Sequence, residues 1–277
     1  MNQELKKISD KFTEKIKNAG EIIGAWNFGS EMHGKADELS DVDIVMLVKG
    51  SLSETERKID SLLEEICEKV LLRWEEDFNS EAIINNGYIL KSGGKLHQFD
   101  VFLLNSDMLE DFMCRIHYTG LSEKDIIFDR NGDVKRLAEN SPKGSRWNED
   151  SDRIQRTYRY NMNMAAKYIL RNDYFKLNNI FRTLYETHAS LLLSEYDSTD
   201  WGGIADKLKF IPAEKQAHLK KYYCTDDFRL NRDNLIYSAE LFESDLSEIL
   251  TKNNIPYKPE AGIAVKNQLI EFTAEIQ

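Results

Sequence analysis

The spacing of apolar residues changes near residue 107, and this change constrains the fold of the 277-residue chain more than any other feature. Before it, short β-like runs at residues 22–28 and 43–48 alternate with stretches of helical spacing. After it, helical spacing dominates, and only residues 126–128 resemble a strand. We therefore predict an α+β chain in which a mixed α and β region precedes a helix bundle.

Further elements of the first region follow from local patterns. Residues 3–18 carry apolar side chains at helical spacing, and Ser53-Glu54-Thr55-Glu56 resembles a capping box that opens a helix with Val70 on its inner face. Two β-like runs within residues 82–104 flank the turn-rich Ser92-Gly93-Gly94. They predict a β-hairpin.

The most loop-like segments of the chain are Asn131-Gly132 and residues 140–145, which contain a proline and a glycine. We place the domain boundary just after them, which gives one domain at residues 1–145 and a second at residues 146–277. The helices predicted in the second domain cover approximately residues 150–171, 174–195, 213–223, 231–252 and 262–276.

Charge is distributed unevenly along the chain, whose formal net charge is -11. Residues 1–150 carry 20 basic and 30 acidic side chains, whereas residues 151–277 carry 17 and 18. Neutralisation of phosphates supplies most nonspecific affinity for nucleic acids, so long DNA or RNA is a disfavoured partner. A small cationic ligand, or a nucleotide that arrives with metal ions, is compatible with this charge.

No segment indicates a membrane or secreted protein. The longest apolar run, residues 44–48, is too short to cross a bilayer, and the N-terminal residues lack the apolar core of a signal peptide. Cys67, Cys114 and Cys224 are widely separated and have no metal-ligand spacing, so we interpret them as reduced thiols. These features predict a cytoplasmic protein.

The residues that carry chemistry follow the first β-like run. Gly29-Ser30 ends that run and offers backbone N–H groups and a hydroxyl that suit a phosphate. The next strand opens with Asp41-Val42-Asp43, and because residues i and i+2 of a strand point to one face, the two carboxylates should lie side by side. Two such charges are tolerable with divalent cations between them, and Mg²⁺ prefers oxygen ligands.

A third carboxylate belongs to Asp100, which lies within the apolar strand pattern of Phe99, Val101 and Phe102. An acid in an apolar strand costs free energy unless it is paired or bound to a metal ion. Asp100 therefore requires an ion-pair partner or a bound metal ion, and it is the candidate third ligand of a metal site.

These motifs resemble the polymerase beta-like nucleotidyltransferase superfamily, and the chain as a whole is similar in architecture to bacterial aminoglycoside and lincosamide nucleotidyltransferases. The resemblance implies that Gly29 and Ser30 bind the triphosphate of ATP or another nucleotide. It implies that Asp41 and Asp43 ligate two Mg²⁺ ions and that Asp100 completes one metal site and helps to position the acceptor hydroxyl. The first domain would then be catalytic, and the helical domain would bind the substrate in a cleft between the two.

Three residues of the helical domain are further candidates. Arg153 and Arg156 lie on a basic face of the helix at residues 150–171, which could contact the triphosphate or be an ordinary solvated surface. In related enzymes a carboxylate of the helical domain can act as general base, which makes Glu186 a candidate. Its spacing from Arg182 is equally that of a surface ion pair.

The function favoured by this resemblance is transfer of AMP from ATP to a hydroxyl of a cationic or sugar-bearing antibiotic, which would confer resistance. Two alternatives stay open. One is a regulatory or antitoxin-like protein that uses the fold to bind nucleotide or to modify a protein partner. The other is a nucleotidyltransferase acting on RNA ends, against which the net charge of -11 argues. The sequence is compatible with a monomer or a homodimer.

Overall fold

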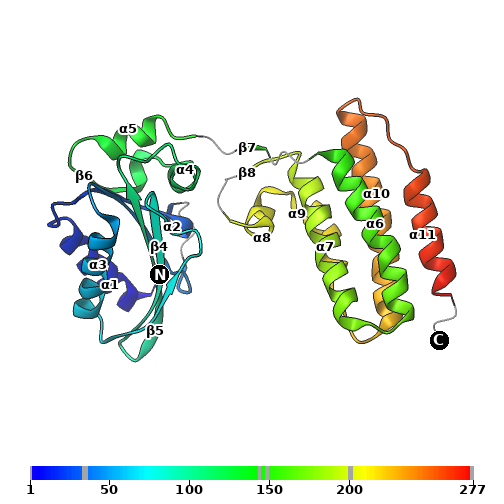
Figure 1. Cartoon of the computed structure of the whole chain (residues 1–277), viewed down its shortest axis with the longest axis horizontal. Coiled ribbons are helices and arrows are strands. Elements are labelled where there is room, and N and C mark those ends of the chain that lie inside the picture. Colours follow the sequence, from blue (N-terminus) through cyan, green and yellow to red (C-terminus); the bar gives the residue numbers. More distant parts are fainter. Residues whose placement is uncertain (1, 33–36, 143–144, 147–149, 199–201, 275–277) are drawn as a thin grey trace. The chain divides into compact units, whose positions relative to one another are not determined.

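The computed structural model describes residues 2–32, 37–142, 145–146, 150–198 and 202–274. The chain divides into two compact units, Met1–Lys143 and Gly144–Gln277 (Figure 1). Each unit has a hydrophobic core of its own. The first unit contains the mixed sheet. The second is helical apart from one short strand pair among its described residues.

The described residues of the first unit form a six-stranded sheet with the order β3-β4-β5-β2-β1-β6. Strand β2 runs parallel to β5, and the other neighbouring strands are antiparallel. The predicted hairpin is confirmed as β4 and β5, and the short run near residue 126 is confirmed as β6. The strands are β1 (Ile22–Asn27), β2 (Val42–Val48), β3 (Lys69–Glu75), β4 (Ile83–Ser92), β5 (Lys95–Asn105) and β6 (Ile126–Asp129).

The helices α1 (Gln3–Ile16) and α3 (Leu52–Ile66) lie together on one face of the sheet (Figure 1). Their apolar side chains form a core with alternate residues of the strands, among them Phe99 and Val101. Since neighbouring residues of a strand point to opposite faces, Asp100 lies on the other face. The remaining helices of this unit are α2 (Gly29–Met32), α4 (Phe112–Tyr118), η1 (Glu123–Asp125) and α5 (Asp133–Glu139).

The predicted start and end of the helix near residue 53 are wrong. Helix α3 begins after Ser51, whose hydroxyl accepts a hydrogen bond from the backbone N–H of Glu54 at 3.3 Å. It ends at Ile66, and Val70 belongs to the edge strand β3 instead. Apolar spacing continues from the helix into this strand, and pairing of β3 with β4 across a bulge between Val70 and Leu72 decides its conformation.

The second unit is a helix bundle, as predicted. Its short strands β7 (Ser145–Arg146) and β8 (Asp197–Ser198) pair with each other and are too short to leave a sequence signal. Its helical elements are α6 (Ser151–Leu170), α7 (Tyr174–Leu193), α8 (Ile204–Lys207), η2 (Leu208–Phe210), α9 (Ala213–His218), η3 (Leu219–Lys221), α10 (Phe228–Lys252) and α11 (Glu260–Phe272). Helices α6, α7, α10 and α11 begin within a few residues of the expected starts. The helix predicted at residues 213–223 is divided into α9 and η3, the elements α8 and η2 were not predicted, and the expected end of the last helix, residue 276, lies outside the described residues. None of the helices in the described part of the chain is long and apolar enough to cross a membrane.

A buried polar cluster around Asp245 of α10 holds the bundle together. Asp245 Oδ2 accepts hydrogen bonds from His188 Nε2 at 2.9 Å and His218 Nδ1 at 2.7 Å, and Oδ1 pairs with Lys215 Nζ at 2.7 Å. The Asp245 side chain is 1% exposed. The cluster therefore joins α7, α9 and α10 through one carboxylate.

The protonation states of this cluster follow from its surroundings. Burial lowers the pKa of His188, which keeps the imidazole neutral. Burial alone would raise the pKa of Asp245, but the hydrogen bonds from His188, His218 and Lys215 hold it well below its usual value. A neutral His188 that donates to Asp245 must accept through Nδ1 from the Tyr222 hydroxyl, which lies 2.9 Å away.

We expect Asp245→Asn to destabilise the helical unit by about 3 kcal/mol, because the neutral amide removes the counter-charge of Lys215 and cannot accept all the hydrogen bonds that His188 and His218 donate. Hydrogen exchange of peptides from α7 and α10, followed by mass spectrometry, measures this change. The matched control is Glu248→Gln. Glu248 contacts the same Lys215 but is 65% exposed, so we expect a cost below about 1 kcal/mol. Equal losses of protection in the two variants would contradict the role of the cluster.

Candidate active site

The structure brings the three predicted aspartates together. Asp43 of β2 is in register with Asp100 of the parallel strand β5, and Asp41 immediately precedes β2. Each of the three offers a carboxylate oxygen, and these oxygens all lie within 4.8 Å of one another. Residues distant in sequence thus form one acidic cluster because β2 and β5 are neighbours in the sheet.

Gly29 lies beside Asp43, at the start of α2, and one residue, Phe28, separates it from β1. Its φ of +60° belongs to the left-handed region that favours glycine. A Cβ at this position would overlap Asp43 Oδ2. The Phe28 N–H, one residue earlier, donates a hydrogen bond to the backbone oxygen of Asp43 at 3.0 Å. Gly29 is therefore required both by the turn and by the close approach of the carboxylate.

Ser30, the residue after Gly29, supplies an unsatisfied polar atom. Its hydroxyl oxygen is buried and has no hydrogen-bond partner among the described residues. A buried polar group without a partner costs free energy, so its presence requires an explanation. A phosphate oxygen that accepts from this hydroxyl would satisfy it, as the prediction for Gly29 and Ser30 requires.

Two residues that the sequence motifs did not identify support Asp100. Gln98 donates a hydrogen bond from Nε2 to Asp100 Oδ2 at 2.8 Å. Gly87 of β4 is in register with Asp100, and a Cβ on it would lie only 2.7 Å from Asp100 Oδ1. A glycine within a strand pattern is a recognised sign of close approach by another group, and this signal could have identified Gly87.

The surroundings of Asp100 oppose the ionisation of its carboxyl group. Burial and the nearby carboxylates of Asp41 and Glu76 raise the pKa of Asp100 to about 6, although the hydrogen bond from Gln98 acts in the opposite direction. A divalent cation would relieve this repulsion, and three carboxylates are the hard oxygen donors that Mg²⁺ binds. Asp41, Asp43 and Asp100 are thus the residues that fit a metal ion here.

The candidates of the second unit have contacts within that unit. Glu186 Oε1 accepts from Arg182 Nε at 2.9 Å, which is the predicted surface ion pair between adjacent helical turns. Arg156 pairs with Asp152 at 3.2 Å, and Arg153 is exposed. Their roles as general base and phosphate ligands stay predictions.

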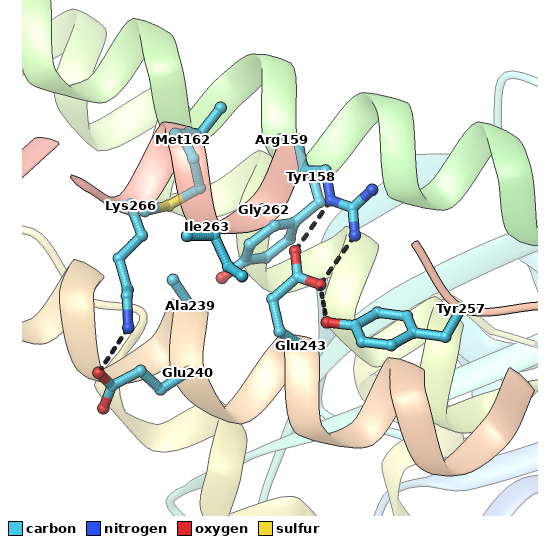
Figure 2. A pocket seen from close by; sticks show the side chains of 11 residues that line it. Tyr158, Arg159, Met162, Ala239, Glu240, Glu243, Tyr257, Gly262, Ile263 and Lys266 are labelled. Atoms are coloured by element: carbon cyan, nitrogen blue, oxygen red, sulfur yellow. Dashed lines mark hydrogen bonds and ion pairs between the residues drawn. The ribbon is translucent and has the colours of Figure 1, made fainter. Parts of the chain in front are cut away.

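Two cavities lie away from the acidic cluster. One, of about 80 Å³, lies between α6, α10 and α11 (Figure 2), where Glu243 pairs with both Arg159 and Tyr257. The other, of about 680 Å³, lies in the first unit and includes Lys49 and Ser106, which follow the ends of β2 and β5. Asp43 lies near the start of β2, and Asp100 lies at the middle of β5. Neither cavity is lined by an aspartate of the cluster.

Comparison with known proteins finds a family match within the first unit. Residues 10–93 match the family model described as "Polymerase beta, Nucleotidyltransferase". The chain has no significant match among curated proteins. Among solved structures it is similar to an aminoglycoside 6-adenyltransferase from Bacillus subtilis, with 11% sequence identity, a TM-score of 0.45, and coverage of 99% of this chain and 100% of that chain.

We expect Gly29→Ala to weaken Mn²⁺ binding by about 10- to 100-fold, because the added methyl group displaces the Asp43 carboxylate. Electron paramagnetic resonance of free and bound Mn²⁺ measures this affinity. Gly94→Ala is the matched control, since Gly94 also has a positive φ, +72°, but has no atom near its Cβ position. The same loss of affinity in both variants would assign the effect to backbone strain rather than to the carboxylate.

Proposed function

We propose that this protein is a Mg²⁺-dependent adenylyltransferase. The premise is the match of residues 10–93 to the polymerase beta-type nucleotidyltransferase domain. The protein transfers AMP from ATP to a hydroxyl group of a small molecule. The observation that carries the proposal is the convergence of Asp41, Asp43 and Asp100 on one cluster with oxygens within 4.8 Å of one another. The buried, unpartnered hydroxyl of Ser30 supports it.

The groups of the first unit divide the tasks of this reaction among them. Gly29 and Ser30 hold the phosphates that leave, and Asp41, Asp43 and Asp100 hold two Mg²⁺ ions, which would stabilise the attacking and leaving oxygens when bound. Asp100 also orients the acceptor hydroxyl. The acceptor oxygen forms a bond to the α-phosphorus, the bond from that phosphorus to the bridging oxygen breaks, and its electron pair leaves with pyrophosphate. The hydroxyl proton passes to a base.

The acceptor in this proposal is a cationic, sugar-bearing antibiotic of the aminoglycoside or lincosamide class, so that the reaction confers resistance. The uneven charge supports a cationic acceptor, because residues 1–150 carry ten more acidic than basic side chains. The helical unit is the proposed substrate-binding domain. Arg153 and Arg156 are its proposed triphosphate contacts, and Glu186 is its proposed general base.

We expect Asp43→Asn to abolish adenylyl transfer, because the substitution removes the charge of a metal ligand. The assay is mass spectrometry of reactions that contain the protein, Mg²⁺, mixed nucleotides, and a panel of aminoglycosides and lincosamides. Asp10→Asn, on the exposed surface of α1, is the matched control and should retain activity. Wild-type turnover by Asp43→Asn would refute the proposal. Adenylylation of the protein itself, with no antibiotic adduct, would favour the regulatory alternative.

Glu186→Gln tests the proposed general base. A positioned base contributes about 10²- to 10⁴-fold to a transfer rate, so we expect kcat to fall by this factor while the KM for ATP stays unchanged. The control, Arg182→Gln, breaks the same ion pair but keeps the carboxylate. An unchanged kcat in Glu186→Gln would assign Glu186 to the surface ion pair alone.

A further inference from the structure

A row of in-register residues crosses the sheet on the face opposite α1 and α3. Trp74 of β3 pairs with Gly87 of β4, and Gly87 pairs with Asp100 of β5. Asp100 in turn pairs with Asp43 of β2. Residues that pair across neighbouring strands project to the same face, so this row joins an aromatic side chain at the sheet edge to the acidic cluster.

Gly87 leaves the space between Trp74 and Asp100 without a side chain. The position that a Cβ of Gly87 would occupy lies 3.9 Å from Trp74 Cβ and 2.7 Å from Asp100 Oδ1. The absence of a side chain at position 87 therefore lets the Asp100 carboxylate lie beside Gly87, and Trp74 borders the same position from the neighbouring strand. A larger residue at position 87 would displace the carboxylate.

Trp74 is exposed although it is large and apolar. It is 61% exposed, and Leu72, two residues earlier on the same strand, is 49% exposed. Leu72 pairs with Ile89, so these side chains, with Gly87, form one apolar surface that we call the Trp74 platform: Leu72, Trp74, Gly87 and Ile89. Proteins usually protect an edge strand with charged residues, and an exposed apolar patch beside a polar site commonly marks a binding surface.

The order of groups along the sheet indicates which molecule the platform binds. Ser30 follows β1 on one side of the acidic cluster, Asp43 and Asp100 lie on the adjacent strands β2 and β5, and Trp74 lies on the other side, on the edge strand β3. In an in-line displacement, the attacking and leaving oxygens approach the phosphorus from opposite sides. If pyrophosphate leaves on the Ser30 side, the acceptor hydroxyl enters from the side of Asp100 and Trp74.

We propose that the Trp74 platform is the acceptor-binding subsite and that it selects a ring-bearing, cationic small molecule. The apolar face of a ring of the acceptor stacks on the indole of Trp74. A positive charge on the acceptor contacts the indole face and the carboxylate of Glu76. Glu76 lies close enough to Asp100 to contribute to its raised pKa, whereas Glu75 pairs with Arg73 at 3.0 Å. This assignment rests on the proposed adenylyl transfer, and it makes Trp74 a specificity-determining residue.

The first measurement is steady-state kinetics of antibiotic adenylylation with Trp74→Ala, Trp74→Phe and Phe112→Ala. We expect Trp74→Ala to raise the KM for the acceptor by about tenfold, with little change in the KM for ATP, because only the acceptor contacts the platform. Trp74→Phe should recover most of this loss, since it retains an aromatic face. Phe112→Ala removes another exposed aromatic of the same unit, 67% exposed, and should behave as wild type.

The second measurement is independent of turnover. Isothermal titration of the same aminoglycosides and lincosamides into the full chain, with Mg²⁺ and a non-hydrolysable ATP analogue, should give a dissociation constant that Trp74→Ala weakens by about tenfold. Binding that depends on Trp74 without any adduct would support the platform and refute the proposed transfer. Adduct formation with an unchanged acceptor KM in Trp74→Ala would refute the platform alone. The absence of binding by wild type would also overturn the platform.

Discussion

The parallel pairing of β2 with β5 is the constraint on which the rest of the candidate site depends. It sets Asp43 beside Asp100, and Asp41 completes a cluster of like charges whose oxygens lie within 4.8 Å of one another. Three carboxylates at this separation repel one another, and the pKa of Asp100 is raised mainly by burial and further by the charges of Asp41 and Glu76. A sheet that carries this arrangement is suited to divalent cations, because their charge offsets the repulsion.

The site depends as much on side chains that are missing as on those that are present. Gly29 and Gly87 each lie against an aspartate, Asp43 and Asp100, and a Cβ at either position would meet a carboxylate oxygen. Each glycine allows the acid to occupy space that another residue would fill. Gly87 also lies between Trp74 and Asp100 in the row across the sheet, so the same glycine would serve both metal ligation and acceptor binding.

The helical unit is stabilised in a different way. Its buried Asp245 has little exposure and several cationic or hydrogen-bonding partners, with His188 and His218 on one oxygen and Lys215 on the other. A buried carboxylate is tolerated only when its partners are complete, so this cluster favours one arrangement of α7, α9 and α10. A helix bundle with one favoured arrangement presents its surface residues, Glu186 among them, in defined positions.

The sequence by itself determined the α+β class, the hairpin, and the identity of the three acids, because strand and helix periods and the cost of an acid in an apolar strand are local properties. It did not reveal that α3 begins after Ser51 or that Val70 belongs to β3, since apolar spacing continues through both elements. Only the tertiary structure decided that Trp74 and Gly87 lie in register with Asp100. That register depends on the β3 bulge and on pairing between segments distant in sequence, which no local pattern encodes.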